Sequence, residues 1–137
     1  MSPVLDASVF IAAISPTERH HDRARRLFDR HPDTEPFLVP ELFRVEVIAG
    51  LSRRGEPVDL LETVDAVIRG PRFHARPLDA ELLERAVHVA RAARLRAYDA
   101  VYVALALMWN EPLVTLDGEV VERSGAAFKE LRVFGSR

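Results

Sequence analysis

The sequence predicts an α/β domain in which helices cover both faces of a parallel sheet. Short β-like runs alternate along the chain with longer segments whose apolar residues recur at helical spacing. Strands that alternate with helices in this way form parallel sheets. A chain of 137 residues is long enough for one such domain and too short for two ordinary ones. We therefore expect a single domain over residues 1–137.

Five short runs are predicted to be the strands of this sheet. A polar, proline-containing break at 31–36 precedes the second run, and Gly70-Pro71 precedes the third. The run nearest the C-terminus is expected to be an edge strand. The predicted strands cover residues 3–5, 37–39, 73–76, 113–115 and 131–134.

Seven helices are predicted around these strands. Thr17 is suited to cap the second helix, and Pro40 is predicted to open the third at the first-turn position where proline is tolerated. Tyr98, Tyr102 and Trp109 share helical spacing, which favours a place in the core over a platform for stacking bases. The predicted helices cover residues 8–14, 17–30, 40–54, 58–69, 79–93, 98–109 and 119–123.

Composition and short motifs exclude several classes of protein. The sequence has no cysteine, which excludes disulfides and thiolate metal sites. It also lacks a glycine-rich phosphate loop, a serine elbow and histidines at zinc-binding spacing. No signal peptide or membrane-spanning stretch is visible, so we expect a soluble, cytoplasmic protein that does not associate with membranes.

The charge pattern argues against a broadly basic nucleic-acid-binding surface. The formal net charge is -2, and the only lysine is Lys129. Arginines nevertheless gather around 23–26, 53–54 and 91–96. They are interpreted mainly as solvated helix faces, and a local basic rim that grips phosphate is the alternative.

Four carboxylates stand out from their surroundings. Asp6 and Asp117 each follow a predicted strand directly, where ligands of parallel sheets bind, although a helix cap or a turn also accounts for each of them. Glu46 has only apolar residues and glycine at helical spacings of three and four. Asp99 is the only charged residue of an otherwise apolar helix, near the end where the helix dipole stabilises an anion.

The four carboxylates together predict a metal site. Several ionised carboxylates in one place repel each other unless a cation neutralises them. Mg²⁺ and Mn²⁺ prefer such all-oxygen ligands, and one or two ions can activate water for attack on a phosphodiester. We therefore predict phosphodiester hydrolysis by a metal-dependent nuclease.

The order and placement of four segments resemble the PIN domain, and most closely the VapC-type toxin ribonucleases of bacterial toxin–antitoxin pairs. The resemblance covers essentially the whole chain. It implies that Asp6, Glu46 and Asp99 are the core acids of the family, that Asp117 is its more variable fourth acid, and that Ser8 and Thr115 are supporting hydroxyls near the metal. The segments are residues 4–8, 45–51, 95–100 and 113–117.

The resemblance also implies properties beyond the site residues. It implies the strand order 3-2-1-4-5, an endoribonuclease dependent on Mg²⁺ or Mn²⁺, a homodimer, and inhibition by a small VapB-like antitoxin that inserts into the active-site groove. RNA is the implied substrate.

Other functions remain open on the sequence. A PIN-type nuclease acting in RNA processing or on DNA has the same metal site, and a catalytically silent PIN-fold binding module has the same fold. A phospho-receiver domain is disfavoured, because Asp6 stands alone after the first strand and Lys129 precedes the last strand instead of following it.

Overall fold

The computed structural model describes residues 1–135, and over this range the chain forms one five-stranded sheet with seven helices. The strands are β1 (Val4–Leu5), β2 (Phe37–Pro40), β3 (Phe73–Arg76), β4 (Leu113–Val114) and β5 (Val133–Phe134). The helices are α1 (Ala7–Ile14), α2 (His21–Asp29), α3 (Leu42–Arg53), α4 (Val58–Ile68), α5 (Ala80–Ala93), α6 (Ala97–Trp109) and α7 (Gly118–Ala127).

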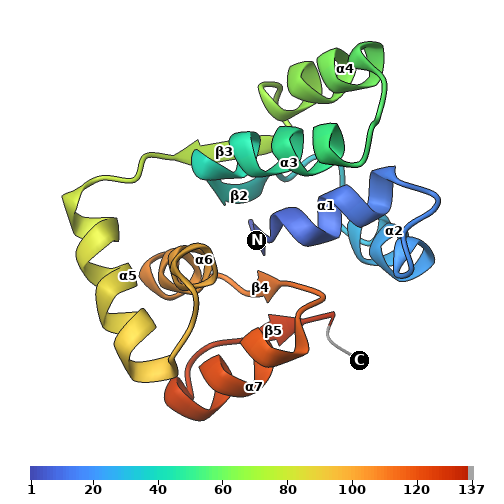
Figure 1. The fold of residues 1–137 in the computed structure, drawn as a ribbon. Helices are drawn as coiled ribbons and strands as arrows, with labels where there is room; N and C mark the ends of the chain where they lie inside the picture. The colour runs from blue at the N-terminus through green and yellow to red at the C-terminus, as the bar shows by residue number, and fades with distance from the viewer. Residues whose placement is uncertain (136–137) are drawn as a thin grey trace.

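The strand order is β3-β2-β1-β4-β5, and all four neighbouring pairs are parallel. The expected α/β class and the expected order are both confirmed. The first strand of the chain is thus the central one, with Leu5 opposite Val114 of β4 and Val4 opposite Leu38 of β2. Helices α1 and α2 lie on one side of the sheet, and α5 and α6 lie on the other (Figure 1).

An aromatic cluster forms the core between the sheet and the helices α1 to α3. Five phenylalanines contact one another with ring centroids 5.1–5.9 Å apart, at tilted, stacked and edge-on angles that aromatic pairs prefer. Four of them are buried, and Phe28 is partly buried against them. The cluster consists of Phe10, Phe28, Phe37, Phe43 and Phe73.

On the other side of the sheet, α6 is buried along most of its length. Seven consecutive residues, from Ala100 to Ala106, are shielded from solvent. This helix contacts β1, β2 and β4 and packs on α5. Within residues 1–135, no helix is both long and apolar enough to cross a membrane.

Two predictions about helix starts are wrong. Helix α2 begins at His21, and its N-cap residue His20 makes no side-chain capping bond, so Thr17 lies in the preceding loop and caps nothing. Pro40 is the last residue of β2 and pairs with Arg76, and α3 begins two residues later at Leu42. Proline fits this strand end because the next donor in the ladder is the Glu41 N–H, which bonds the Arg76 carbonyl at 2.9 Å.

Two of the three aromatic residues assigned to the core are exposed. Tyr102 is 2% exposed, as predicted, but Tyr98 is 57% exposed and Trp109 is 43% exposed. Both lie near the ends of α6, beyond the buried segment, and the guanidinium of Arg76 covers the Trp109 ring at 4.2 Å from its centroid. Helical spacing predicted that the three residues share a face of the helix. Their burial depends instead on where along the helix each one lies.

The aromatic cluster generates a stability prediction. Phe43 is fully buried between Phe10 and Phe73, so Phe43→Ala removes its burial and leaves a cavity that the sheet cannot close. We expect the free energy of unfolding in urea to fall by about 3–5 kcal/mol. Phe134→Ala, at a position 47% exposed, is the matched control and should change it by less than about 1 kcal/mol. Equal losses in the two variants would contradict this account of the core.

Candidate active site

Asp6 lies at the point where β1 passes into α1. Its Oδ1 accepts a hydrogen bond from the Ser8 N–H at 3.3 Å, so the residue is the N-cap of α1. Its Oδ2 accepts from the hydroxyls of Ser8 at 3.0 Å and of Thr115 at 2.8 Å. Burial raises the pKa of Asp6 above its usual range, and these hydrogen bonds act in the opposite direction. The capping role considered in the sequence is therefore real, and it holds the carboxylate in a fixed place.

Asp117 occupies the equivalent place after the neighbouring strand β4. It is the N-cap of α7, and its Oδ1 accepts from the N–H groups of Glu119 at 2.9 Å and Val120 at 3.3 Å. Its own N–H donates to Thr115 Oγ1 at 3.1 Å. The buried Thr115 hydroxyl therefore touches both acidic residues at the ends of β1 and β4.

Glu46 projects from α3 toward α6. Its Oε1 accepts a hydrogen bond from the Tyr102 hydroxyl at 2.9 Å. The pKa of Glu46 is raised to about 7, mainly by burial and also by the charges of Asp6 and Asp99, while the Tyr102 hydrogen bond acts in the opposite direction. Burial also raises the pKa of Tyr102, so that its hydroxyl keeps the proton that it donates to Glu46.

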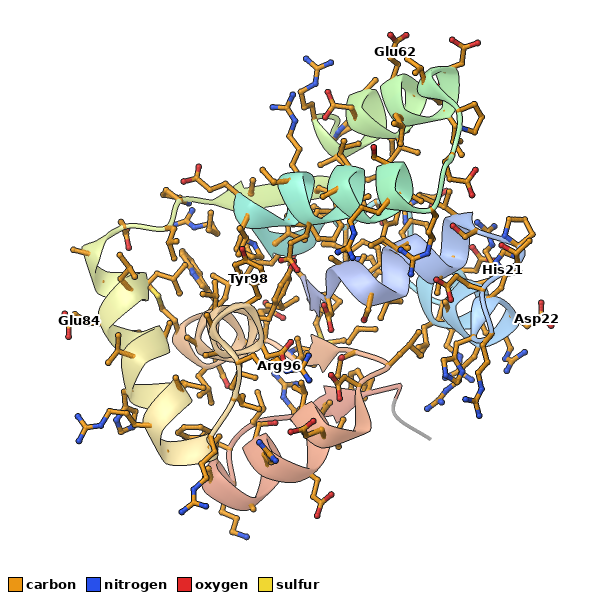
Figure 2. The ribbon with its side chains drawn as sticks, viewed as in Figure 1. His21, Asp22, Glu62, Glu84, Arg96 and Tyr98 are labelled. Atoms are coloured by element: carbon orange, nitrogen blue, oxygen red, sulfur yellow. The ribbon has the colours of Figure 1, made fainter. Side chains whose placement is uncertain are left out.

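Asp99 lies in the first turn of α6. Its pKa is raised to about 6, mainly by burial and also by the charges of Asp6 and Asp117, while Arg96 acts in the opposite direction. The mutual influence of these carboxylates places them within electrostatic range of one another. Figure 2 labels Arg96 and Tyr98, which lie near Asp99 at the start of α6, a helix seen nearly end-on in this view.

All four predicted carboxylates line one pocket of about 450 Å³. Ser8 also lines this pocket, and Thr115 lies directly behind Asp6. Within residues 1–135, no three acidic or histidine side chains lie close enough together to hold a metal ion in the conformations seen. The donor set nevertheless suits a hard cation, because it is all oxygen and its members already disfavour each other's ionised forms.

The pocket extends well beyond the acidic residues. It follows one face of α1 and reaches residues at the far end of that helix that the sequence did not single out as a site. Its remaining lining residues are Ala7, Ile11, Ala12, Glu18, His20, Arg54 and Leu116. Arg54 belongs to the arginine pair 53–54, for which a phosphate-gripping rim was the alternative interpretation, but no local pattern marked Glu18, because its contact with Arg54 joins residues 36 positions apart.

Tyr102 is the other residue of the site that the sequence did not single out. It was assigned to the core, which is where its ring lies, but its hydroxyl reaches Glu46. The available signal was its spacing of three residues from Asp99, which places the two on neighbouring positions of one helix face.

Comparison with known proteins identifies the family of this fold and pocket. The PIN domain family model matches residues 4–125. Ribonuclease VapC3 of Pyrobaculum aerophilum is 29% identical over 127 residues, which is 90% of this chain and 95% of that protein.

Solved structures agree with this match at the level of the fold. The sarcin–ricin-loop-cleaving toxin VapC20 of Mycobacterium tuberculosis is 23% identical with a TM-score of 0.74, covering 96% of this chain and 99% of that one. A chain of a toxin–antitoxin complex from Klebsiella pneumoniae is 16% identical with a TM-score of 0.71, covering 97% and 96%. Because the family model spans nearly the whole described chain, this protein belongs to the PIN domain family.

Proposed function

We propose that this chain is a metal-dependent endoribonuclease and the toxin of a toxin–antitoxin pair. The observation that carries the proposal is the convergence of Asp6, Glu46, Asp99 and Asp117 on one pocket from four separate parts of the chain. The ribonuclease name of the Pyrobaculum relative supports RNA as the substrate.

In this proposal the four carboxylates hold Mg²⁺ or Mn²⁺ and are the catalytic residues. When bound, the cation supplies the positive charge that activates water and stabilises the phosphodiester during attack. Ser8 and Thr115 orient the Asp6 carboxylate through its Oδ2. Tyr102 orients Glu46 through Oε1, which leaves Oε2 free of that bond.

The proposal includes two protein partners. The toxin–antitoxin complexes among the structural neighbours support a cognate, VapB-like antitoxin that covers the pocket, and we infer that the toxin itself is a homodimer. Light scattering on the purified chain tests the dimer directly: a monomer mass at working concentrations would overturn that part of the proposal.

The first test is cleavage of a mixed RNA pool in Mg²⁺, in Mn²⁺ and in EDTA. We expect cutting with metal, none in EDTA, and a loss of at least about 100-fold in Asp99→Asn, since even partners behind a metal ligand typically contribute about 10–100-fold. Glu84→Gln is the control and should cut normally, because this residue lies on the outer side of α5 (Figure 2).

The outcomes of this assay separate the alternatives. Cutting that persists in EDTA or in Asp99→Asn would overturn the metal mechanism. Metal-dependent cutting of single-stranded DNA in preference to RNA would move the function to a DNA nuclease. Absence of cutting across RNA and DNA pools would favour a binding module.

The raised pKa values of Glu46 and Asp99 predict how stability depends on pH without metal. Their folded values of about 7 and about 6 lie above the ordinary 4.5 and 3.8, so the folded state binds more protons between these limits. Their stabilising contribution is therefore complete below about pH 4 and is lost as the pH rises through 6 and 7.

The measurement is the melting temperature in EDTA from about pH 5 to pH 8. We expect it to fall with pH in the wild type, to fall less in Glu46→Gln, and to fall fully in the Glu84→Gln control. Added Mg²⁺ or Mn²⁺ should raise it more at pH 8 than at pH 5, because metal ligands must be deprotonated. An identical pH dependence in wild type and Glu46→Gln would contradict the burial of this carboxylate.

A further inference from the structure

The pocket has a second end that the proposed chemistry does not use. From Asp6 it runs along a face of α1 formed by Ala7, Ser8, Ile11 and Ala12, three of which have small side chains. Helix α1 has eight residues and is therefore about 12 Å long. A nucleic-acid strand lying along the whole pocket would therefore extend well past the carboxylates.

Arg54 lies at this far end and is held in place by its neighbours. Its Nε donates to Glu18 Oε1 at 2.7 Å, its Nη2 pairs with the same carboxylate, and its Nη1 donates to the Gly50 carbonyl at 3.0 Å. The guanidinium is thereby fixed before any ligand arrives.

The same guanidinium keeps bonding capacity for a ligand. Arginine has five N–H donors, and the contacts to Glu18 and Gly50 use three of them. Its side chain is 43% exposed, so the remaining donors can be reached from solvent. Planar guanidinium groups bind phosphate oxygens in a bidentate manner, which lysine does not do.

The charge of the pocket makes this arginine stand out. Within the described part of the chain, five acidic side chains line the pocket, and Arg54 is the one lining residue with a permanent positive charge. A polyanion whose scissile phosphate lies at the carboxylates needs a cationic contact elsewhere along its backbone. Arg54, the C-cap of α3, follows Glu46 by eight helical residues, about 12 Å along the helix axis, which suits a flanking phosphate better than the scissile one.

Building on the proposed nuclease function, we propose that Arg54 positions the substrate by binding a backbone phosphate that flanks the scissile bond of an RNA strand. Glu18 and the Gly50 carbonyl orient its guanidinium, and the small side chains along α1 leave room for the strand between the two ends. An acidic protein segment could also meet an arginine, but it would have no reason to continue into the carboxylate end of the pocket.

The test uses RNA binding in the absence of cleavage. A fluorescein-labelled single-stranded RNA of mixed sequence is titrated with Asp99→Asn protein in Mg²⁺, and the affinity is followed by anisotropy across a KCl series. Adding Arg54→Gln should weaken binding about tenfold and reduce the slope of log affinity against log salt by about 0.7, as expected for one lost phosphate contact on a single strand. Arg54→Lys should lie between, because it keeps the charge and loses the planar fork.

Arg53→Gln is the matched control. It removes the same charge from the adjacent residue, which does not line this pocket, and should leave the affinity and the slope unchanged. In protein with Asp99 intact, Arg54→Gln should raise KM with little change in kcat, because a flanking contact is equally strong in the bound substrate and in the transition state.

Two outcomes would overturn the inference. Either Arg54→Gln leaves the RNA affinity and the salt slope unchanged, or Arg53→Gln lowers both as much as Arg54→Gln does. The first would leave Arg54 as a structural or partner-binding residue. Failure of the nuclease proposal is distinguishable, since the wild type would then not cleave RNA while binding could still depend on Arg54. Metal-dependent cleavage with Arg54-independent binding would sink this inference alone.

Discussion

The hydrogen bond from Thr115 to Asp6 is the interaction on which the site depends. A hydroxyl can both donate and accept a hydrogen bond, and Thr115 does both. It donates to Asp6 Oδ2 and accepts from the Asp117 N–H. These residues follow β1 and β4, whose parallel pairing sets Leu5 opposite Val114. A shift in that pairing would leave the buried Asp6 carboxylate without its partner, which is costly in an apolar interior. The register of the sheet and the geometry of the site are therefore one constraint.

The site works against the stability of the fold that carries it. Burial raises the pKa values of Asp6, Glu46 and Asp99, so ionising each of them costs more free energy in the folded protein than in the unfolded chain. Strongly shifted pKa values gathered in one cleft are typical of functional sites. The helix caps made by Asp6 and Asp117 recover part of this cost, because each carboxylate satisfies N–H groups of a first helical turn. The burial of the phenylalanine cluster on one side of the sheet and of α6 on the other also stabilises the fold against this cost.

The sequence allowed the element types and the α/β class to be predicted, and it singled out the four carboxylates that line one pocket, because these follow from local patterns. Asp99 stood out in an apolar helix, and Asp6 and Asp117 followed strands. The strand order needed the family resemblance, since no pattern within a strand says which strand lies beside it.

What could not be predicted depends on distant packing. The Tyr102 bond to Glu46 spans 56 positions, and the exposure of Tyr98 depends on where α6 leaves the cover of its neighbours. Helix α2 begins at His21, four residues after Thr17, without a side-chain cap, and no local pattern indicated that start.

The central place of β1 has a consequence for how the protein comes into being. Synthesis makes β1 first, yet one of its two partners, β4, is among the last strands made, and Thr115 lies 109 positions after Asp6. Until β4 is complete, β1 has one open edge and Asp6 has neither Thr115 nor Asp117 beside it. An unfinished or C-terminally truncated chain therefore has no assembled pocket. The activity proposed for this protein can therefore appear only after β4 has been made and has paired with β1.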